Sequence, residues 1–327
     1  MPPQMPAQPE FSYATLFDIT PDEKLPFAVY VFFKGKHIRY RESGEALQTE
    51  TYNRFIYKRI NKIYIQKKEY ALFEQYSSSK KKAEEDAYND PKQSVEQKIS
   101  NQVVRKLTKN TQRIFAGDDA DLGKSVESAF ETVSDIISNT MAKPYLRIFD
   151  KLAESPNSVI NHSMRVSLMS TFVGYSLGFV NPEMLEYLAA AGLLHDLGKT
   201  RMNFSDELEF TEEEEKLLMR QHPAKSVEIL ERVPSVPDEV KRIILEHHEC
   251  RDGSGYPNGI TGGRMHNLSK VFTIVNTFDN MAGALPGNKN EKYQAAAKFM
   301  SEKLRTHFDP TILPRALKIL SGPMKLK

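Results

Sequence analysis

The feature that most constrains this chain is a group of five histidines between residues 162 and 248, which come with acidic partners at ordered spacings. The group consists of His162, the adjacent pair His195 and Asp196, His222, and the adjacent pair His247 and His248. Imidazole and carboxylate together are the ligands of divalent transition metals, and an adjacent pair at a helix end can address two ions. The alternative is a set of core histidines, each bonded to a backbone carbonyl. Because five histidines share the pattern with Asp196, it predicts a metal site of a hydrolytic kind.

Length and charge set the outer limits. The chain has 327 residues, of which 40% are hydrophobic, enough for two domains with a sizeable core. Its 45 basic and 43 acidic side chains give a formal net charge of +2. This balance offers no electrostatic case for a surface that binds duplex nucleic acid, so we expect no such partner.

Cysteine usage and hydropathy indicate the compartment. The single cysteine, Cys250, excludes an internal disulfide framework and fits a reducing environment. The longest apolar run, residues 187–194, is far shorter than the roughly 20 residues of a membrane helix. The first residues are rich in proline and lack the features of a signal peptide. We therefore expect a cytoplasmic protein with no membrane association.

The predicted fold class is α+β: a small N-terminal α/β module followed by an all-α helical bundle. We expect a disordered lead over residues 1–10, the module over 11–76, a charged helical linker over 77–120 and the helical domain over 121–327. Within the module, β-branched and aromatic runs predict the order β-β-α-β-α, with a hairpin turning at Gly35. Such a module would be regulatory or bind a protein partner.

Two segments between the module and the histidines leave alternatives open. The lysine run 80–82 could bind phosphate or a membrane surface, but acidic residues follow at once, which favours an exposed helix or linker. Beyond it, apolar residues recur at helical spacing and predict an amphipathic helix. They are Val126, Phe130, Val133, Ile137 and Met141. This helix could begin the bundle of the second domain or form the seam of a homodimer.

Helical patterns continue through the rest of the chain. Residues 185–194 form an apolar helix that ends at the His195–Asp196 pair, and residues 240–248 form another that ends at the second histidine pair. Thr211, followed by four glutamates, predicts a capped helix start. Residues 270–281 repeat apolar side chains at helical spacing.

Four strings of residues together resemble the HD-GYP family, a branch of the HD phosphohydrolases that cleaves cyclic di-GMP. The strings are His195-Asp196-Leu197-Gly198-Lys199, His222-Pro223, His247-His248-Glu249 and Asp252-Gly253-Ser254-Gly255-Tyr256-Pro257. The resemblance extends over residues 145–320. It implies an all-helical domain, a cyclic dinucleotide as ligand and a centre of two or three metal ions, usually iron or manganese.

The resemblance also assigns roles to residues. The matched metal ligands are His162, His195, Asp196, His222, His247 and His248, with Asp196 as the bridging carboxylate. Lys199 matches a lysine that touches the scissile phosphate, so Asp196 and Lys199 are the predicted catalytic residues. Gly255, Tyr256 and Pro257 match the substrate loop. Taken alone, Lys199 could simply counter a helix terminus, and the loop is a turn whose glycines allow unusual backbone angles beside an aromatic ring.

Two departures from the family concern the metals. Asn276 stands where the family has its last metal ligand, an aspartate; an amide oxygen can bind a hard cation but adds no charge. Asp279, one helical turn further on, could compensate only if the helix rotates. Ser158 replaces the glutamate of three-metal members. The expected centre therefore has two divalent metal ions, iron or manganese, with Asn276 as a ligand. We expect hydrolysis at such a centre to stop at the linear dinucleotide.

Other departures concern the substrate. Lys270, a predicted substrate contact, replaces an arginine; it keeps the charge but loses the bidentate geometry. Residues 284–287 replace a segment whose arginine engages the ligand, and Lys289 could supply that charge. The loop between Lys199 and Thr211 is shorter than expected.

The resulting hypothesis is a phosphodiesterase that hydrolyses cyclic di-GMP to the linear dinucleotide pGpG through a metal-bridging hydroxide. One alternative is a degenerate signalling module that binds without turnover, which Asn276 and Leu285 favour. Another is a phosphohydrolase of a different nucleotide, because the scaffold does not fix the substrate.

Overall fold

The computed structural model describes residues 10–89, 92–116, 119–139, 148, 152–179, 181–202, 204 and 209–322. The chain divides into two compact units, Met1–Gln93 and Ser94–Lys327, each of which is described by itself. Among the described residues, none of the helices has both the length and the apolar character needed to cross a membrane.

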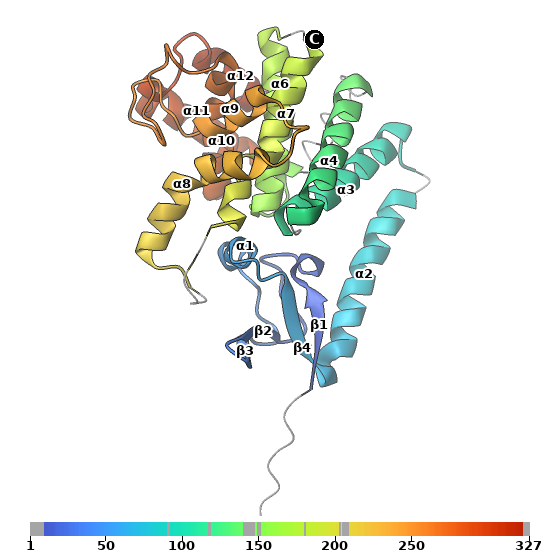
Figure 1. The fold of residues 1–327 in the computed structure, drawn as a ribbon. Coiled ribbons are helices and arrows are strands. Elements are labelled where there is room, and N and C mark those ends of the chain that lie inside the picture. Colours follow the sequence, from blue (N-terminus) through green and yellow to red (C-terminus); the bar gives the residue numbers. More distant parts are fainter. Residues whose placement is uncertain are drawn as a thin grey trace, which may run out of the picture. The chain divides into compact units, whose positions relative to one another are not determined.

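The first unit is a four-stranded antiparallel sheet with two helices (Figure 1). Its elements are β1 (Phe11–Thr15), β2 (Val29–Phe33), β3 (Lys36–Arg41), α1 (Thr49–Tyr57), β4 (Lys62–Gln66) and α2 (Tyr70–Asn89). The strand order across the sheet is β1-β4-β2-β3. Along β4, the alternate residues Ile63 and Ile65 are buried, and with the buried Val31 of β2 they contribute to the core of this unit.

The predicted hairpin is confirmed, and one strand was missed. Lys34 and Gly35 both have positive φ, 47° and 79°, which suits the two-residue turn between β2 and β3. Strand β1 was not predicted. It pairs with β4, where Tyr13 lies opposite Tyr64. Because that partner lies about fifty residues later in the chain, the local pattern of a five-residue strand carried no sign of it.

The second unit is helical, as predicted. Its helices are α3 (Val95–Ala116), α4 (Asp119–Asn139), α6 (Val159–Leu177), α7 (Pro182–Leu194), α8 (Glu212–Leu230), α9 (Asp238–Glu246), α10 (Asn267–Ala284), α11 (Lys289–Lys303) and α12 (Leu313–Ser321). The predicted cap of α8 is confirmed: the Thr211 side chain accepts from the Glu214 amide, and four glutamates occupy the first turn.

The division between the units falls inside the segment 77–120, which the sequence assigned to a linker. Within that segment, α3 packs against α4 and α6 and buries Leu107, Ile114 and Phe115 completely. Residues 95–116 are therefore part of the helical unit, a correction to the predicted linker. Its polar composition concealed an apolar stripe. Most of the predicted disordered lead, residues 1–9, lies outside the described residues.

Helix α4 contains the predicted amphipathic pattern. Val126, Val133 and Ile137 are buried, and α4 packs against α3 and α7. Met141 lies outside the described residues. The apolar stripe is thus used inside the second unit, which favours the bundle over the dimer seam.

Helices α6 and α7 meet at unusually close range, and this contact positions the candidate site. A Cβ atom on Gly192 would fall 2.2 Å from the Ser167 Cα, so glycine is required where the two helices touch. Ser167 Oγ donates to the Ala189 carbonyl at 2.7 Å across the same contact. The first turn of α6 and the end of α7 are thereby brought side by side.

Candidate metal centre

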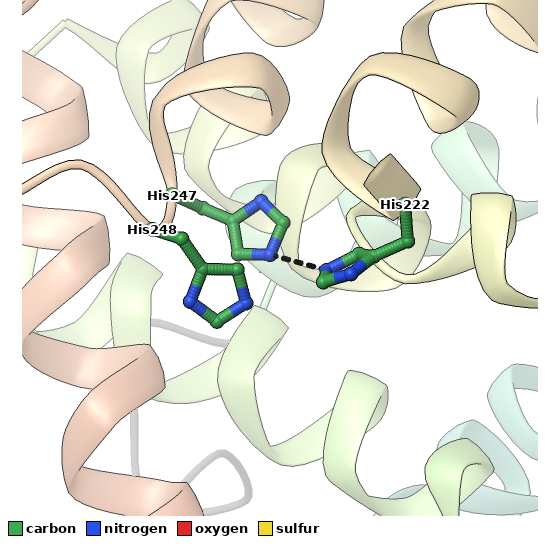
Figure 2. Close-up of side chains that lie close together, drawn as sticks. All are labelled: His222, His247 and His248. Carbon is green, nitrogen blue, oxygen red and sulfur yellow. Dashed lines mark hydrogen bonds between the residues drawn. The ribbon is translucent and has the colours of Figure 1, made fainter. Parts of the chain in front are cut away.

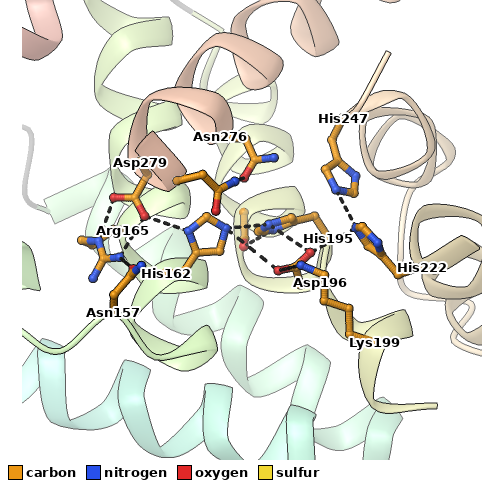
Figure 3. Close-up of polar contacts among 12 residues, drawn as sticks. Asn157, His162, Arg165, His195, Asp196, Lys199, His222, His247, Asn276 and Asp279 are labelled. Carbon is orange, nitrogen blue, oxygen red and sulfur yellow. Dashed lines mark hydrogen bonds and ion pairs between the residues drawn. The ribbon is translucent and has the colours of Figure 1, made fainter. Parts of the chain in front are cut away.

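Four helices of the second unit bring the five predicted histidines together. His162 lies in the first turn of α6, His195 follows α7, His222 lies within α8, and His247 and His248 follow α9. They form two neighbouring groups (Figures 2 and 3). The first cluster is His162, His195 and Asp196, and the second cluster is His222, His247 and His248. Within each cluster the potential ligand atoms lie within 4.8 Å of one another.

A tight turn after α7 joins the two clusters. A Cβ atom on Gly198 would fall 2.2 Å from the His222 carbonyl oxygen. The Gly198 amide donates to Ser226 Oγ at 2.8 Å, and that hydroxyl donates to the His195 carbonyl at 2.7 Å. The glycine therefore lets the turn lie directly against α8, so that His195 and His222 approach the same carboxylate.

Backbone carbonyls select the tautomer of three of the histidines. The Nδ1 atoms of His195, His222 and His247 lie 2.9, 2.9 and 2.6 Å from the carbonyl oxygens of Gly192, Leu218 and Ile244 respectively. A carbonyl oxygen can only accept, so each Nδ1 carries the hydrogen and each Nε2 presents a lone pair. This is the arrangement that metal-binding imidazoles use.

Pairs of Nε2 atoms lie close together without a hydrogen between them, as they would around a bound cation. His222 Nε2 lies 3.1 Å from His247 Nε2, and His162 Nε2 lies 3.2 Å from His195 Nε2. Two lone pairs at this distance cannot form a hydrogen bond with each other. Asp196 Oδ1, fully buried and without a hydrogen-bond donor, lies 3.5 Å from His195 Nε2 and 3.3 Å from His222 Nε2. Such a set of donor atoms fits divalent metal ions.

Burial favours the neutral form of four of the histidines, the form that binds metal ions. It lowers the pKa of His195 to about 3, with His162 and Lys199 adding to the effect. Burial likewise holds the pKa of His222, His247 and His248 below the ordinary value.

Asp196 remains ionised in the same surroundings. Burial alone would raise its pKa, but the nearby His195 and Lys199 outweigh burial and hold the pKa well below the usual value. Lys199 Nζ lies 2.7 Å from Asp196 Oδ2. The predicted catalytic lysine therefore contacts the predicted bridging carboxylate directly.

The glycine-tyrosine-proline loop lies against the second cluster. The Tyr256 ring stacks on the His248 ring, with centroids 4.6 Å apart and planes 22° from parallel. Gly255 is needed for a reason other than the one predicted: a Cβ there would fall 2.3 Å from the Cys250 amide nitrogen. The unusual backbone angle occurs at Gly253, where φ is 81°. The peptide bond between Tyr256 and Pro257 is cis.

Glu249 holds this loop in place, a role that the sequence did not reveal. Its buried carboxylate accepts from the Asn258 amide at 2.7 Å and from the Ile260 amide at 3.0 Å. The sequence did contain a clue, because Glu249 is an acid directly after two histidines. In that position, however, a carboxylate is equally consistent with metal binding.

Asn276 is buried in α10, and Asp279 does not replace it. The Asn276 Oδ1 accepts from Asn280 Nδ2 at 3.3 Å. Both oxygens of Asp279 are already engaged by Arg165 and His162 (Figure 3). The alternative in which Asp279 compensates as a ligand is therefore disfavoured, because Arg165 and His162 already hold its carboxylate.

Two further positions from the sequence analysis, Lys270 and Ser158, make contacts outside the two clusters. Lys270 donates to Asn267 Oδ1 at 3.3 Å and lines a small pocket whose lining includes none of the predicted metal ligands. The pocket is formed with Arg251, Gly262, Met265, Thr273, His307, Phe308 and Asp309. Ser158 caps α6 by accepting from the Asn161 amide. In the loop between Lys199 and Thr211, residues 203 and 205–208 lie outside the described residues.

Comparison with known proteins gives one family match and several relatives. A family model described as HD domain matches residues 148–312. The 3'3'-cGAMP-specific phosphodiesterase 3 of Vibrio cholerae serotype O1 is 26% identical over 229 residues, which cover 67% of this chain and 49% of the relative. The cyclic di-GMP phosphodiesterase PA4108 of Pseudomonas aeruginosa is 27% identical over 208 residues, 61% of this chain and 49% of the relative. The chain thus spans about half the length of these curated relatives.

A solved structure shares the fold. Bd1817, a HDG"Y"P protein from Bdellovibrio bacteriovorus, superposes with a TM-score of 0.61 at 21% sequence identity. The match covers 96% of this chain and 100% of that chain, so it includes both units.

Proposed function

The chain belongs to the HD-domain family, in its HD-GYP branch, and on that premise we propose that it is a metal-dependent phosphodiesterase that hydrolyses cyclic di-GMP to pGpG. One observation carries the proposal: buried imidazole Nε2 atoms converge on Asp196 Oδ1, which has no hydrogen-bond donor. A buried polar atom without a partner is rare, and its surroundings here are those of a metal ligand.

The residues present would hold two divalent ions, iron or manganese. The first cluster and the second cluster would each take one, with Asp196 as the bridge because its Oδ1 lies near histidines of both. Asn276 would contribute at most a neutral oxygen. When bound, the ions supply an activated water and the positive charge that a phosphodiester needs for hydrolysis.

Lys199 and Tyr256 would act on the substrate. The Lys199 ammonium, next to Asp196 Oδ2, would contact the scissile phosphate and give a proton to the leaving oxygen. Burial, with Asp196 adding to it, raises the pKa of Tyr256, so its hydroxyl stays a neutral donor. Gly255 and Pro257 would keep that ring on His248 and beside the substrate. Lys270, in its separate pocket, would touch a more distant part of the ligand.

Two observations favour other functions. Several relatives are named as 3'3'-cGAMP phosphodiesterases, which makes a different cyclic dinucleotide the second candidate substrate. A neutral Asn276 would weaken the proposed metal site, which favours a module that binds its ligand without turnover.

The first unit would regulate the enzyme or bind a protein partner. Its sheet exposes aromatic side chains, with Tyr13 61% and Phe32 50% accessible. Exposed aromatic rings of this kind are enriched in protein interfaces. We propose that the protein acts in the cytoplasm, because its single cysteine fits a reducing compartment. Homodimerisation remains a prediction.

The test is product analysis. The full chain, purified without oxygen and loaded with iron or manganese, is incubated with cyclic di-GMP and, in parallel, with 3'3'-cGAMP. We expect pGpG from cyclic di-GMP. If only 3'3'-cGAMP gives a linear product, then 3'3'-cGAMP replaces cyclic di-GMP as the proposed substrate. Absence of product in both arms, with two ions per chain confirmed, would leave the binding module as the function.

A further inference from the structure

His162 differs from His195, His222 and His247 in the group that fixes its tautomer. Backbone carbonyls accept from Nδ1 of His195, His222 and His247, but the partner of His162 Nδ1 is a side chain. Asp279 Oδ2 lies 2.7 Å from that nitrogen. A backbone carbonyl persists through any substitution, whereas a carboxylate can be lost. The ligand state of His162 therefore depends on the residue at position 279.

Arg165 holds Asp279 in this orientation. The Arg165 Nε donates to Asp279 Oδ1 at 2.7 Å, and a terminal nitrogen donates to Oδ2 at 2.9 Å, a bidentate pair (Figure 3). The same guanidinium donates to Asn157 Oδ1 at 2.5 Å. A Cβ on Gly283 would meet the Asn157 amide at 2.4 Å, so Asn157 packs directly against α10. Position 279 lies on α10, and Arg165 lies one turn after His162 on α6.

The arrangement opposes a specific unproductive state. Without an acceptor at Nδ1, the hydrogen of a neutral His162 would move to Nε2 and donate to the His195 Nε2 lone pair, which is 3.2 Å away. That bond would occupy two ligand atoms of the first cluster at once. A carboxylate at position 279 accepts from Nδ1 and keeps Nε2 free. A guanidinium donates only, so it keeps both Asp279 oxygens as acceptors.

We propose that Asp279 and Arg165 are positioning residues that set the tautomer of His162 and thereby keep the first cluster able to bind an ion. The inference rests on the proposed metal centre for its consequence, but the tautomer is a property of the metal-free chain. It also gives Asp279 a role separate from that of position 276, where the side chain is a neutral asparagine.

The test replaces the ion pair by apolar side chains, Asp279→Leu with Arg165→Met, in the full chain. Removing both partners avoids a buried unpaired charge. Histidine labelled with nitrogen-15 is observed in the metal-free protein at about pH 8, above the ordinary histidine pKa. We expect the His162 hydrogen to move from Nδ1 to Nε2, while His195, His222 and His247 keep theirs on Nδ1 as internal controls. Metal affinity at the first cluster should fall about 10- to 100-fold.

Arg165→Lys is the matched variant, because it preserves the charge and leaves Asp279 a carboxylate. We expect the hydrogen of His162 to stay on Nδ1 and the metal affinity to stay close to that of the unaltered chain. Equal losses of affinity in both variants with an unmoved hydrogen would show a packing role and overturn the proposal. A His162 without hydrogen on Nδ1 in the unaltered chain would overturn it without any variant. If the unaltered chain binds no metal while the tautomer shifts as expected, the proposed function fails and the positioning role stands.

Discussion

The two halves of the candidate centre achieve the same end by different means. In the second cluster, Nδ1 of His222 and of His247 donates to a carbonyl of the preceding turn, so the helix itself prepares the ligand. In the first cluster, His162 depends on a buried aspartate and arginine. The first cluster also contributes Asp196, whose carboxylate lies near histidines of both. The comparison indicates that backbone carbonyls orient His222 and His247 of the second cluster, whereas the first cluster combines a backbone-held His195 with a His162 that depends on single side chains.

Loss of the shared carboxylate should be the largest effect, because it removes the one feature common to both halves. For Asp196→Ala we expect metal affinity to fall by more than about 100-fold and turnover to disappear. This loss exceeds the usual effect of removing a residue that only hydrogen-bonds to a metal ligand. Metal content by mass spectrometry and product analysis measure the two. Asp238→Ala, at an exposed position on α9 whose side chain is 94% accessible, is the control and should change neither. Unchanged metal content in the Asp196 variant would refute the shared bridge.

Loss of one histidine from a single cluster sharpens the comparison. His162→Gln should reduce the first cluster's ion while the second cluster keeps its own, so about one ion per chain remains. His222→Gln should do the reverse. Metal stoichiometry after desalting distinguishes them. If either substitution empties both clusters, the two halves are a single cooperative site and the comparison fails.

Restoring an acid at position 276 tests the charge balance. Asn276→Asp adds a buried carboxylate, which should destabilise the metal-free chain. The affinity for the ions should rise by about tenfold, equivalent to roughly 1.4 kcal/mol. The melting temperature should therefore be lower without metal and should rise further on metal addition than in the unaltered chain. An identical metal-induced rise in both proteins would mean that position 276 does not face the ions.

The last prediction concerns the stability of the turn that joins the halves, with no direct change to a ligand atom. Gly198→Ala places a methyl group against the His222 carbonyl and should reduce the free energy of unfolding by about 1–3 kcal/mol. Gly123→Ala is the matched control: it lies in α4 with no atom within 4 Å of the added Cβ, so it should stabilise the chain by about 0.5–1 kcal/mol. Urea unfolding measures both. Equal shifts would show that the turn is not tightly packed.

Residue type and spacing selected the five histidines and Asp196, and the structure brings these residues together in two neighbouring clusters. Their role as metal ligands stays a prediction, and the residues that support them were not predicted. The network of Asp279, Arg165 and Asn157 was not predicted, because Asp279 lies more than a hundred residues after Arg165 and Asn157 in the chain and nothing in the local sequence links them. The roles of Gly198 and Gly255 also depend on backbone from other segments. Strand β1 was missed for the same reason: its partner is distant in the chain.

The central claim is that two neighbouring clusters share Asp196 and each hold an ion. The most direct measurement is a crystal structure of the manganese-loaded chain with an anomalous difference map. The account predicts two peaks, one among the Nε2 atoms of His162 and His195 and the other among those of His222 and His247, both next to Asp196 Oδ1. A single peak, or peaks away from these atoms, would contradict it.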